Sequence, residues 1–437
     1  MPPRSFPPGF LWGTATGAHQ VEGQNSNNQW WDWEQQPGRI WHGDRSGDAC
    51  GWWRDPEPDF DRAAALGQNA HRLSIEWSRI EPHEGVFDDA ALDRYRAMLL
   101  SLRRRGITPM ITLHHFTNPR WLEAQGGWLH PATPQRFARF AARAVAALGD
   151  LCELWCTINE PMVYVTQGYL LGIWPPGRND ILGAIRVAAA LLRGHVEAAE
   201  AIRNVKPALH IGIVHQLRLF DPATQAARDI VAAATWDYLF NAIMLHALCT
   251  GRVLPPFGSG RVWPALRESC DFFGLNYYTR ERVAFDARQP GLMFGRRYTP
   301  PDVLQSEAGF EGKTYGEIYP AGLYRALRRA ASLGLPIYIT ETGLPDADDH
   351  QRPGFILGHL AAAHRAIQDG VDLRGIFLWT LVDNFEWTEG WGLRFGLYAF
   401  DERTGARRRR PSAALYAAIA RANAIPGEGW LAAAGKT

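Results

Sequence analysis

The sequence predicts an α/β fold: a single (β/α)8 barrel (TIM barrel) over residues 1–437, with long loops after its strands. Short apolar runs recur along the 437 residues, and segments with helical spacing lie between them. Strands that alternate with helices form a parallel sheet, and eight such strands close into a barrel. Because a plain barrel needs only ~250 residues, the extra length is expected in the loops.

Eight runs are expected to be the barrel strands. Each is short and rich in β-branched, aromatic or other apolar residues, and most are nearly apolar throughout, as strands buried on both faces are. In chain order, these runs span residues 10–14, 70–75, 108–113, 153–158, 211–214, 272–275, 337–340 and 375–378.

Helical spacing is clearest between the third and fourth runs. There, apolar residues recur at i, i+3, i+4 and i+7 from Phe137 to Leu148. A second helix is expected over 185–203 and a third from near Tyr319. Residues 279–320 are rich in Gly, Pro and aromatic residues without a period, and predict a long loop or a small excursion. No change in composition marks a second domain.

The charge of the chain excludes several classes of partner. The 46 Lys and Arg nearly balance the 45 Asp and Glu, giving a net charge of +1, which argues against nucleic acid and an anionic membrane surface. Four arginines at 407–410 are expected to be a solvated surface turn. No apolar stretch approaches the ~20 residues that cross a bilayer, and no signal peptide is visible.

The cysteine and tryptophan counts add two expectations. The five cysteines are odd in number and scattered, and no two form a CxxC pair, so free, buried thiols of a cytoplasmic protein are expected. The 18 tryptophans outnumber the 13 tyrosines. Tryptophan near polar side chains suits a flat, partly apolar ligand such as a sugar ring. The sequence leaves homo-oligomerisation open.

Polar side chains follow most of the predicted strands, where barrel enzymes place their catalytic residues. In strand order, these candidates are His19, Gln20 and Glu22, then Arg72, Glu76 and Trp77, then His114 and His115, then Asn159 and Glu160, then Asn276, Tyr277 and Tyr278, then Glu341, and finally Trp379, Glu386 and Trp387.

Glu160 and Glu341 require a specific explanation because each ends a nearly apolar strand. A buried carboxylate is costly unless it is paired or neutralised. The fourth and seventh strands face each other across the mouth of an eight-stranded barrel, so the two carboxyls suit acid/base and nucleophilic work on a glycosidic bond. Each one taken alone fits equally well a structural ion pair with an arginine.

Other chemistries lack their usual motifs. His114, His115 and the two glutamates could supply metal ligands, but there is no HExxH, no HxH and no Cys/His cluster, so no metal is expected. No GxGxxG or GxxxxGKS/T loop is present, and no GxSxG elbow, which argues against nucleotide binding and serine hydrolysis. No cofactor is expected.

With these residues in view, the chain resembles glycoside hydrolase family 1, the family of β-glucosidases and β-galactosidases. The resemblance runs from Phe6 to about Ala420. Five motifs carry it: FLWGTATGAHQVEG at 10–23, RLSIEWSR at 72–79, TINEP at 157–161, NYY at 276–278 and ITETG at 339–343.

The resemblance implies a role for each candidate residue. Glu160 would be the acid/base and Glu341 the nucleophile, with Arg72 and Tyr278 supporting the nucleophile. Trp121 is expected either to floor the aglycone side or to pack in an ordinary loop. The substrate-binding residues would be Gln20, His115, Asn159, Asn276, Trp379, Glu386 and Trp387.

Three departures from the family pattern matter. The asparagine that usually follows the nucleophile is Thr342, which is expected to weaken one hydrogen bond. His115 is followed by Phe-Thr instead of Trp-Asp, so aglycone contacts are expected to differ. The segments 30–33 and 346–353 resemble the archaeal-type subgroup.

The resemblance implies retaining hydrolysis, by double displacement, of terminal non-reducing β-D-glucosyl, galactosyl or fucosyl residues of small glycosides or short oligosaccharides. A transglycosylating enzyme and a non-hydrolytic sugar-binding protein of the same fold are the alternatives. Glu386 would repel a phosphate, which favours unphosphorylated sugars. The sequence does not choose the preferred sugar or the aglycone.

Overall fold

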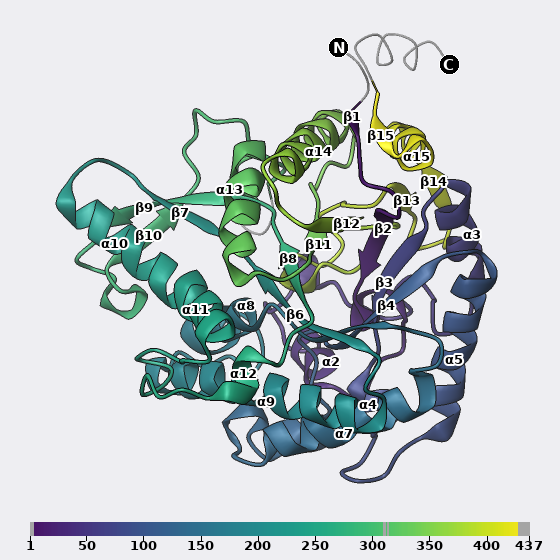
Figure 1. Ribbon diagram of the computed structural model, residues 1–437, viewed down its shortest axis with the longest axis horizontal. Coiled ribbons are helices and arrows are strands. Elements are labelled where there is room, and N and C mark those ends of the chain that lie inside the picture. The colour runs from purple at the N-terminus through teal and green to yellow at the C-terminus, as the bar shows by residue number, and fades with distance from the viewer. Residues whose placement is uncertain (1–3, 309–311, 313, 427–437) are drawn as a thin grey trace.

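Eight parallel strands close into a barrel at the centre of the molecule (Figure 1). The computed structural model describes residues 4–308, 312 and 314–426. All eight predicted strands are confirmed, with ends that shift by two residues at most. Around the barrel, the strands are β2 (Leu11–Thr16), β3 (Ala70–Ser74), β4 (Thr108–His114), β5 (Leu154–Asn159), β6 (His210–Gln216), β8 (Phe272–Asn276), β11 (Ile337–Thr342) and β12 (Leu373–Leu378).

The barrel strands are buried on both faces. Along β5, Leu154 and Cys156 belong to a cluster inside the barrel, whereas Trp155 belongs to the larger cluster between the barrel and the helices. Successive side chains of a strand point to opposite faces, so this alternation separates the two cores. Each barrel strand contributes to the inner cluster, through Ala15, Ala70, Met110, Cys156, Val214, Phe272, Tyr338 and Phe377.

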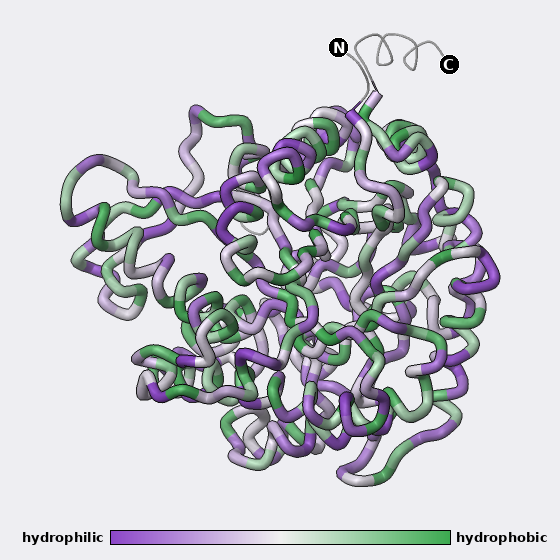
Figure 2. The backbone as a smooth tube through the Cα atoms, viewed as in Figure 1, coloured by the Kyte–Doolittle hydropathy of each residue, from purple (hydrophilic) through white to green (hydrophobic). Residues whose placement is uncertain are grey.

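Helices surround the barrel, and the three predicted ones are confirmed as α7 (Thr133–Leu148), α9 (Ile181–Val205) and α13 (Pro320–Ala330). The face of α7 that recurs every three or four residues is the buried one. Figure 2 shows hydrophilic and hydrophobic residues interleaved along such outer helices. The other elements on the β2 to β5 side are α1 (Ala18–Val21), α2 (Gln29–Glu34), η1 (Trp41–Gly43), α3 (Glu57–Ala65), α4 (Trp77–Ile80), α5 (Asp89–Arg104), α6 (Arg120–Ala124), η2 (Gly127–Leu129), α8 (Pro161–Val165) and the π-helical turn η3 (Thr166–Leu170).

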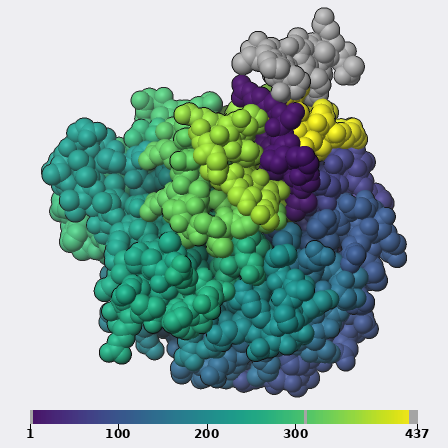
Figure 3. All heavy atoms as spheres, viewed as in Figure 1, coloured from purple at the N-terminus to yellow at the C-terminus, as the bar shows by residue number. Residues whose placement is uncertain are grey.

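A small lobe stands beside the barrel where the sequence predicted a loop or excursion. Strands β9 (Arg280–Phe285) and β10 (Gly295–Tyr298) form an antiparallel hairpin that joins β7 (Leu219–Pro222) in a three-stranded sheet. The prediction for 279–320, which rested on the absence of a period, therefore missed a hairpin. The strands of this hairpin are short and only partly buried. Residues 309–311 and 313 lie outside the described residues. Figures 1 and 3 show this lobe projecting on the left.

The remaining elements complete the β6 to β12 side and join the two ends of the chain. Strand β1 (Arg4–Ser5) pairs with β15 (Ala424–Ile425). The other elements are α10 (Ala227–Asp237), the π-helical turn η4 (Tyr238–Ala242), α11 (Ile243–Thr250), α12 (Pro264–Arg267), η5 (Pro290–Leu292), η7 (Ala331–Leu333), α14 (Arg352–Gln368), η8 (Trp387–Glu389), β13 (Tyr398–Phe400), β14 (Arg407–Arg409) and α15 (Pro411–Ala422).

Two expectations about surface and burial are wrong. The arginine run is not a solvated turn: Arg410 is buried against Asp383, and Arg407 pairs with Asp59 at 2.9 Å. Buried carboxylates need such partners, and composition alone could not reveal them. Of the five cysteines, all free, Cys249 is exposed and the others are buried. Within the described residues, no helix has the length and apolar character needed to cross a membrane.

Candidate active site

Glu160 and Glu341 come from the carboxyl ends of two barrel strands and line one cavity. Glu160 directly follows β5, and its backbone N–H donates to the carbonyl of Val214 at 2.8 Å. Its φ of 48° is in the left-handed region, which is uncommon for a residue with a side chain and clusters at functional sites. Glu341 is part of β11. The two glutamates are 5% and 4% exposed, so their carboxyls meet in a largely dry site.

Two donors fix the carboxylate of Glu341. Nη1 of Arg72 donates to Oε1 at 2.5 Å, and the hydroxyl of Tyr278 donates to Oε2 at 2.7 Å. Arg72 is itself fixed from neighbouring strands, because Nε donates to Thr112 Oγ1 at 3.0 Å and Nη2 to Asn159 Oδ1 at 2.7 Å. Charge-assisted bonds of this kind are short and directional. They hold both oxygens of Glu341 in one orientation.

Glu160 has a different environment. Nδ2 of Asn276 donates to its Oε1 at 2.8 Å, and within the described part of the chain no ion pair involves this carboxyl. Burial, followed by the nearby charge of Glu341, raises the pKa of Glu160 to about 8. At neutral pH Glu160 therefore carries a proton. One protonated carboxyl and one paired with a cation are the two states that acid and nucleophile require.

Gln20, Trp379 and Glu386 form a second polar group near the two glutamates. Nε2 of Gln20 and Nε1 of Trp379 both donate to Oε2 of Glu386, at 3.4 and 3.2 Å. Burial raises the pKa of Glu386 to about 8, and the charge of Glu341 adds to the rise. Three carboxyls thus share this region, and two of them hold protons at neutral pH.

Aromatic rings cover the same side of the cavity. The ring of His115 stacks with Trp379 and with Trp387, with centroids 5.9 and 6.0 Å apart and interplanar angles of 17°. Burial, followed by the charge of Arg72, lowers the pKa of His115 well below its ordinary value. The imidazole is therefore neutral and offers one donor and one acceptor.

Several buried polar atoms in this region lack hydrogen-bond partners among the described residues. They are Oε1 of Gln20, Nδ2 of Asn159, Nδ1 of His115 and Oγ1 of Thr342. A buried polar group without a partner costs about 1–3 kcal/mol, so such atoms mark places where a polar ligand fits.

The cavity measures about 700 Å³ with its open mouth, which is the size of a small-molecule site. Among the residues for which the sequence predicted a role in the site, His115, Glu160, Tyr278, Glu341, Trp379, Glu386 and Trp387 line it. The others with a predicted role, except for Trp121, hydrogen-bond to these residues or to one another: Gln20 to Glu386, Arg72 to Glu341, Asn159 to Arg72, and Asn276 to Glu160. The further strand-end candidates His19, Glu22, Glu76, Trp77, His114 and Tyr277 do not line it.

Trp121 is the exception. Its Nε1 donates to the carbonyl of Glu81 at 2.9 Å, and its ring packs edge-on against Trp77. It does not line the cavity. These contacts are ordinary loop packing, the second of the two roles that the sequence left open for Trp121. Helix α6 turns the side chain toward α4.

The sequence missed several residues that line the cavity, notably Trp174, Gln216, Arg218 and Tyr315. Gln216 and Arg218 follow the fifth predicted strand, so the rule that searches strand ends would have found them. Trp174 and Tyr315 lie in long loops without a period, and no local pattern marks them.

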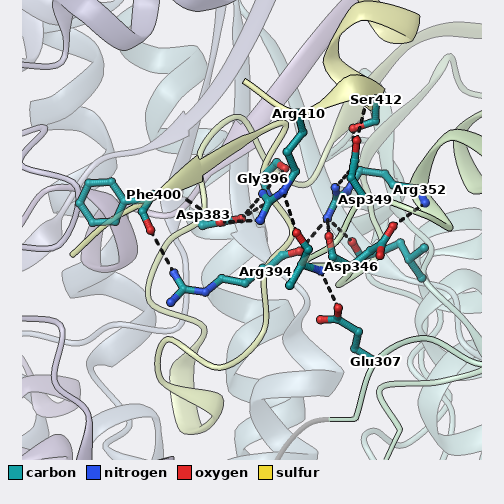
Figure 4. Close-up of polar contacts among 12 residues, drawn as sticks. Glu307, Asp346, Asp349, Arg352, Asp383, Arg394, Gly396, Phe400, Arg410 and Ser412 are labelled. Atoms are coloured by element: carbon teal, nitrogen blue, oxygen red, sulfur yellow. Dashed lines mark hydrogen bonds and ion pairs between the residues drawn. The ribbon is translucent and has the colours of Figure 1, made fainter. Parts of the chain in front are cut away.

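A buried ion network holds the loops that follow β11 and β12 (Figure 4). Arg410 pairs with both oxygens of Asp383, at 2.8 and 2.9 Å, and Asp383 also accepts from the backbone N–H of Gly396 at 2.7 Å. In the other loop, Arg352 pairs with Asp349. Glu386 follows Asp383 by three residues, so this network sets the course of the loop that carries it.

No metal site is apparent in the part of the chain that the structure describes, since no three His, Cys, Asp or Glu side chains are grouped to hold an ion. The nearest polar partners of both catalytic candidates are an arginine, a tyrosine and an asparagine. These groups stabilise and orient the two carboxyls.

Comparisons with known proteins agree with this geometry. "Beta-glucosidase A" of Thermotoga maritima is 32% identical, over 97% of this chain and 99% of that protein. An archaeal relative, "Beta-galactosidase" of Pyrococcus woesei, is 29% identical over 96% and 98%. The solved structure of the β-glycosidase from Pyrococcus horikoshii is 40% identical, with a TM-score of 0.89 over 98% of this chain and 97% of that one.

The resemblance that the motifs indicated extends to almost the whole chain. The sequence profile of glycosyl hydrolase family 1 matches residues 3–425. That range contains the complete barrel, both glutamates and the loops after β11 and β12. The chain belongs to glycosyl hydrolase family 1.

Proposed function

We propose that the chain is a retaining β-glycosidase that removes terminal non-reducing β-D-glucosyl, and also galactosyl or fucosyl, residues from small glycosides or short oligosaccharides. The observation that carries this proposal is the contrast between two buried carboxyls: Glu341 is held by Arg72 and Tyr278, whereas Glu160 accepts from the amide of Asn276 and burial raises its pKa. The structures of the Thermotoga maritima β-glucosidase in complex with glucoimidazole and with galacto-hydroximolactam support acceptance of both sugar configurations.

Glu341 attacks the anomeric carbon in the first step. An Oε lone pair forms the bond to carbon as the bond to the leaving oxygen breaks, and Glu160 gives its proton to that oxygen. The product is a glycosyl ester of Glu341. Its formation removes the negative charge that helps to keep the pKa of Glu160 high. The pKa of Glu160 then falls, which prepares it to act as a base.

Water attacks the ester in the second step. Glu160, now ionised, takes a proton from water as the new bond to the anomeric carbon forms and Glu341 leaves. Two displacements at one carbon return the original configuration. Asn276 donates to Glu160 and keeps its carboxyl pointed into the cavity through both steps.

Recognition of the sugar falls to side chains on the opposite side. Gln20, His115 and Glu386 offer donors and acceptors to the hydroxyls, and Trp379 and Trp387 pack against the ring. A site built to hydrogen-bond a hydroxyl strongly rejects the analogue that lacks it. Glu386 offers no positive charge to a sugar phosphate, so we propose unphosphorylated substrates.

We also propose a cytoplasmic location for the enzyme. The support is chemical: all five cysteines are free, as expected for thiols in a reducing compartment. We further propose that the chain works as one catalytic domain, since all the site residues come from one barrel.

The test is the hydrolysis of p-nitrophenyl β-glycosides, including the 6-phosphoglucoside, by the wild type, Glu341→Gln and Glu160→Gln. We expect release of the β-anomer, loss of turnover in Glu341→Gln, and slowing in Glu160→Gln that is greatest for poor leaving groups. Faster turnover of the 6-phosphoglucoside than of the glucoside would refute the proposed substrate class. Release of the α-anomer would refute retention.

A further inference from the structure

Arg218 lies where the leaving group of the substrate must pass. It follows β6 by two residues and lines the cavity with both catalytic glutamates. In the closed barrel, β6 is next to β5, which carries Glu160, and is opposite β2, whose loop carries Gln20. The proton donor stands beside the leaving oxygen, so the side of the cavity formed by β5 and β6 is the aglycone side.

Only some of the hydrogen-bond donors of the Arg218 guanidinium have partners within the described residues. Its Nε donates to Oε1 of Gln216 at 3.1 Å, and Nη1 donates to Oε1 of Glu281 at 3.3 Å. Its Nη2 has no hydrogen-bond partner among the described residues, and the side chain is 19% exposed. The other oxygen of Glu281 accepts from Arg297 at 3.2 Å. Two guanidinium groups therefore share one carboxylate, which leaves an excess of positive charge.

Within the described chain, Arg218 is the one arginine or lysine that lines the cavity, and the acids that line it are Glu160, Glu341, Glu386 and Glu389. Glu341, which is paired as a carboxylate with Arg72, repels an anionic group on a substrate, whereas Arg218 attracts it. Because guanidinium binds carboxylate through paired N–H groups, the free Nη2 and the long bond from Nη1 suit such a partner.

We propose that Arg218 binds a carboxylate on the aglycone, so that the enzyme prefers β-glycosides whose leaving group is an acid. This inference rests on the proposed glycosidase function and adds the class of aglycone. The carboxylate can belong to an aromatic acid or to a sugar acid. Gln167 and Trp174, which also line the cavity, offer an amide and an aromatic face to either.

The test measures binding, so that it does not depend on turnover. S-linked glucosides of 4-mercaptobenzoate and 4-mercaptobenzamide form one matched pair. Thio-linked glucosyl-glucuronate and thiocellobiose form the other. Calorimetry gives the Kd of each for the wild type. We expect the acid of at least one pair to bind about tenfold or more tightly than its neutral partner, and the pair that responds identifies the source of the carboxylate.

Three variants locate the effect. Arg218→Gln is expected to abolish the preference for the acid. Glu281→Gln is expected to strengthen it, because it removes the carboxylate that competes for Arg218. Arg297→Gln, the matched control, removes a guanidinium from the same carboxylate outside the cavity lining and is expected to keep the preference.

Equal Kd values within each pair for the wild type, or a preference that survives in Arg218→Gln, would overturn the proposal. Hydrolysis of p-nitrophenyl β-glucoside is measured in the same preparations. If the wild type does not hydrolyse this substrate, the result counts against the glycosidase function alone, and the Kd ratios still decide the role of Arg218.

Discussion

Arg72 and Glu341 form a buried ion pair across the barrel, with Nη1 of Arg72 2.5 Å from Oε1 of Glu341. Their side chains are 1% and 5% exposed, so water does not share in stabilising either charge. The pair links β3 to β11, and the second arm of the same guanidinium reaches Asn159 on β5. A single arginine thus orients the proposed nucleophile and the residue that precedes the proposed acid.

We therefore expect Arg72→Met to lower both activity and stability. Without the guanidinium, the carboxyl of Glu341 is left buried with only Tyr278 as a donor. Removing one partner of a buried pair costs about 3–5 kcal/mol of stability. The kcat for p-nitrophenyl β-glucoside is expected to fall by about 10²–10⁴-fold, because the displaced carboxylate no longer meets the anomeric carbon. The exposed pair of Arg374 and Asp372 supplies the control, since Arg374→Met is expected to change neither quantity appreciably.

The pH profile of the enzyme should report on Glu160. Its pKa is raised to about 8 by burial and by the charge of Glu341, and only its protonated form can donate to the leaving group. kcat/KM is therefore expected to fall as pH rises through about 8. In Glu160→Gln, measured with a leaving group that needs no proton, this alkaline fall should disappear. An unchanged alkaline fall in that variant would assign the limb to another group.

The raised pKa of Glu386 predicts a pH-dependent stability. Its folded value of about 8 exceeds the ordinary 4.5, so between these values the folded state holds a proton that the unfolded state has released. The free energy of unfolding then decreases as pH rises through this range. Glu386→Gln removes this contribution, and its stability relative to the wild type is expected to be greater at pH 9 than at pH 5. Urea unfolding at both values measures the difference, and the exposed Glu153→Gln should show none.

The sequence predicted the barrel well because its signal is local. In the run at 154–159 all six residues are buried and four are apolar, and such a run can be recognised without knowing its partner strands. The hairpin of β9 and β10 was missed because its residues are half-exposed and aromatic or charged side chains interrupt any period. What decides their strand structure is pairing with β7, about 60 residues earlier in the chain.

The same distinction holds for the candidate site: residues with a local sequence signal could be predicted, and residues placed by distant partners could not. Glu160 and Glu341 were identifiable because carboxyls at the ends of apolar strands are costly and so need a reason. Tyr315 could not be found this way, since its place in the cavity depends on how a long loop returns to the barrel. Arg410 was misjudged for a similar reason: its partner Asp383 lies 27 residues away, and four adjacent arginines look alike in the sequence.

The arginine run at 407–410 allows a buried arginine to be compared directly with an exposed one. Arg410 pairs with Asp383 in the buried network behind the Glu386 loop (Figure 4), whereas its neighbour Arg409 is exposed. Arg410→Met leaves the carboxylate of Asp383 buried without its cation, and we expect a loss of about 3–5 kcal/mol in the free energy of unfolding. Arg409→Met removes the same charge from the surface and should cost less than about 0.5 kcal/mol. Urea unfolding compares the two. Similarly small losses for the two variants would mean that other donors, such as the N–H of Gly396, stabilise Asp383 without the guanidinium. The network would then not depend on the ion pair.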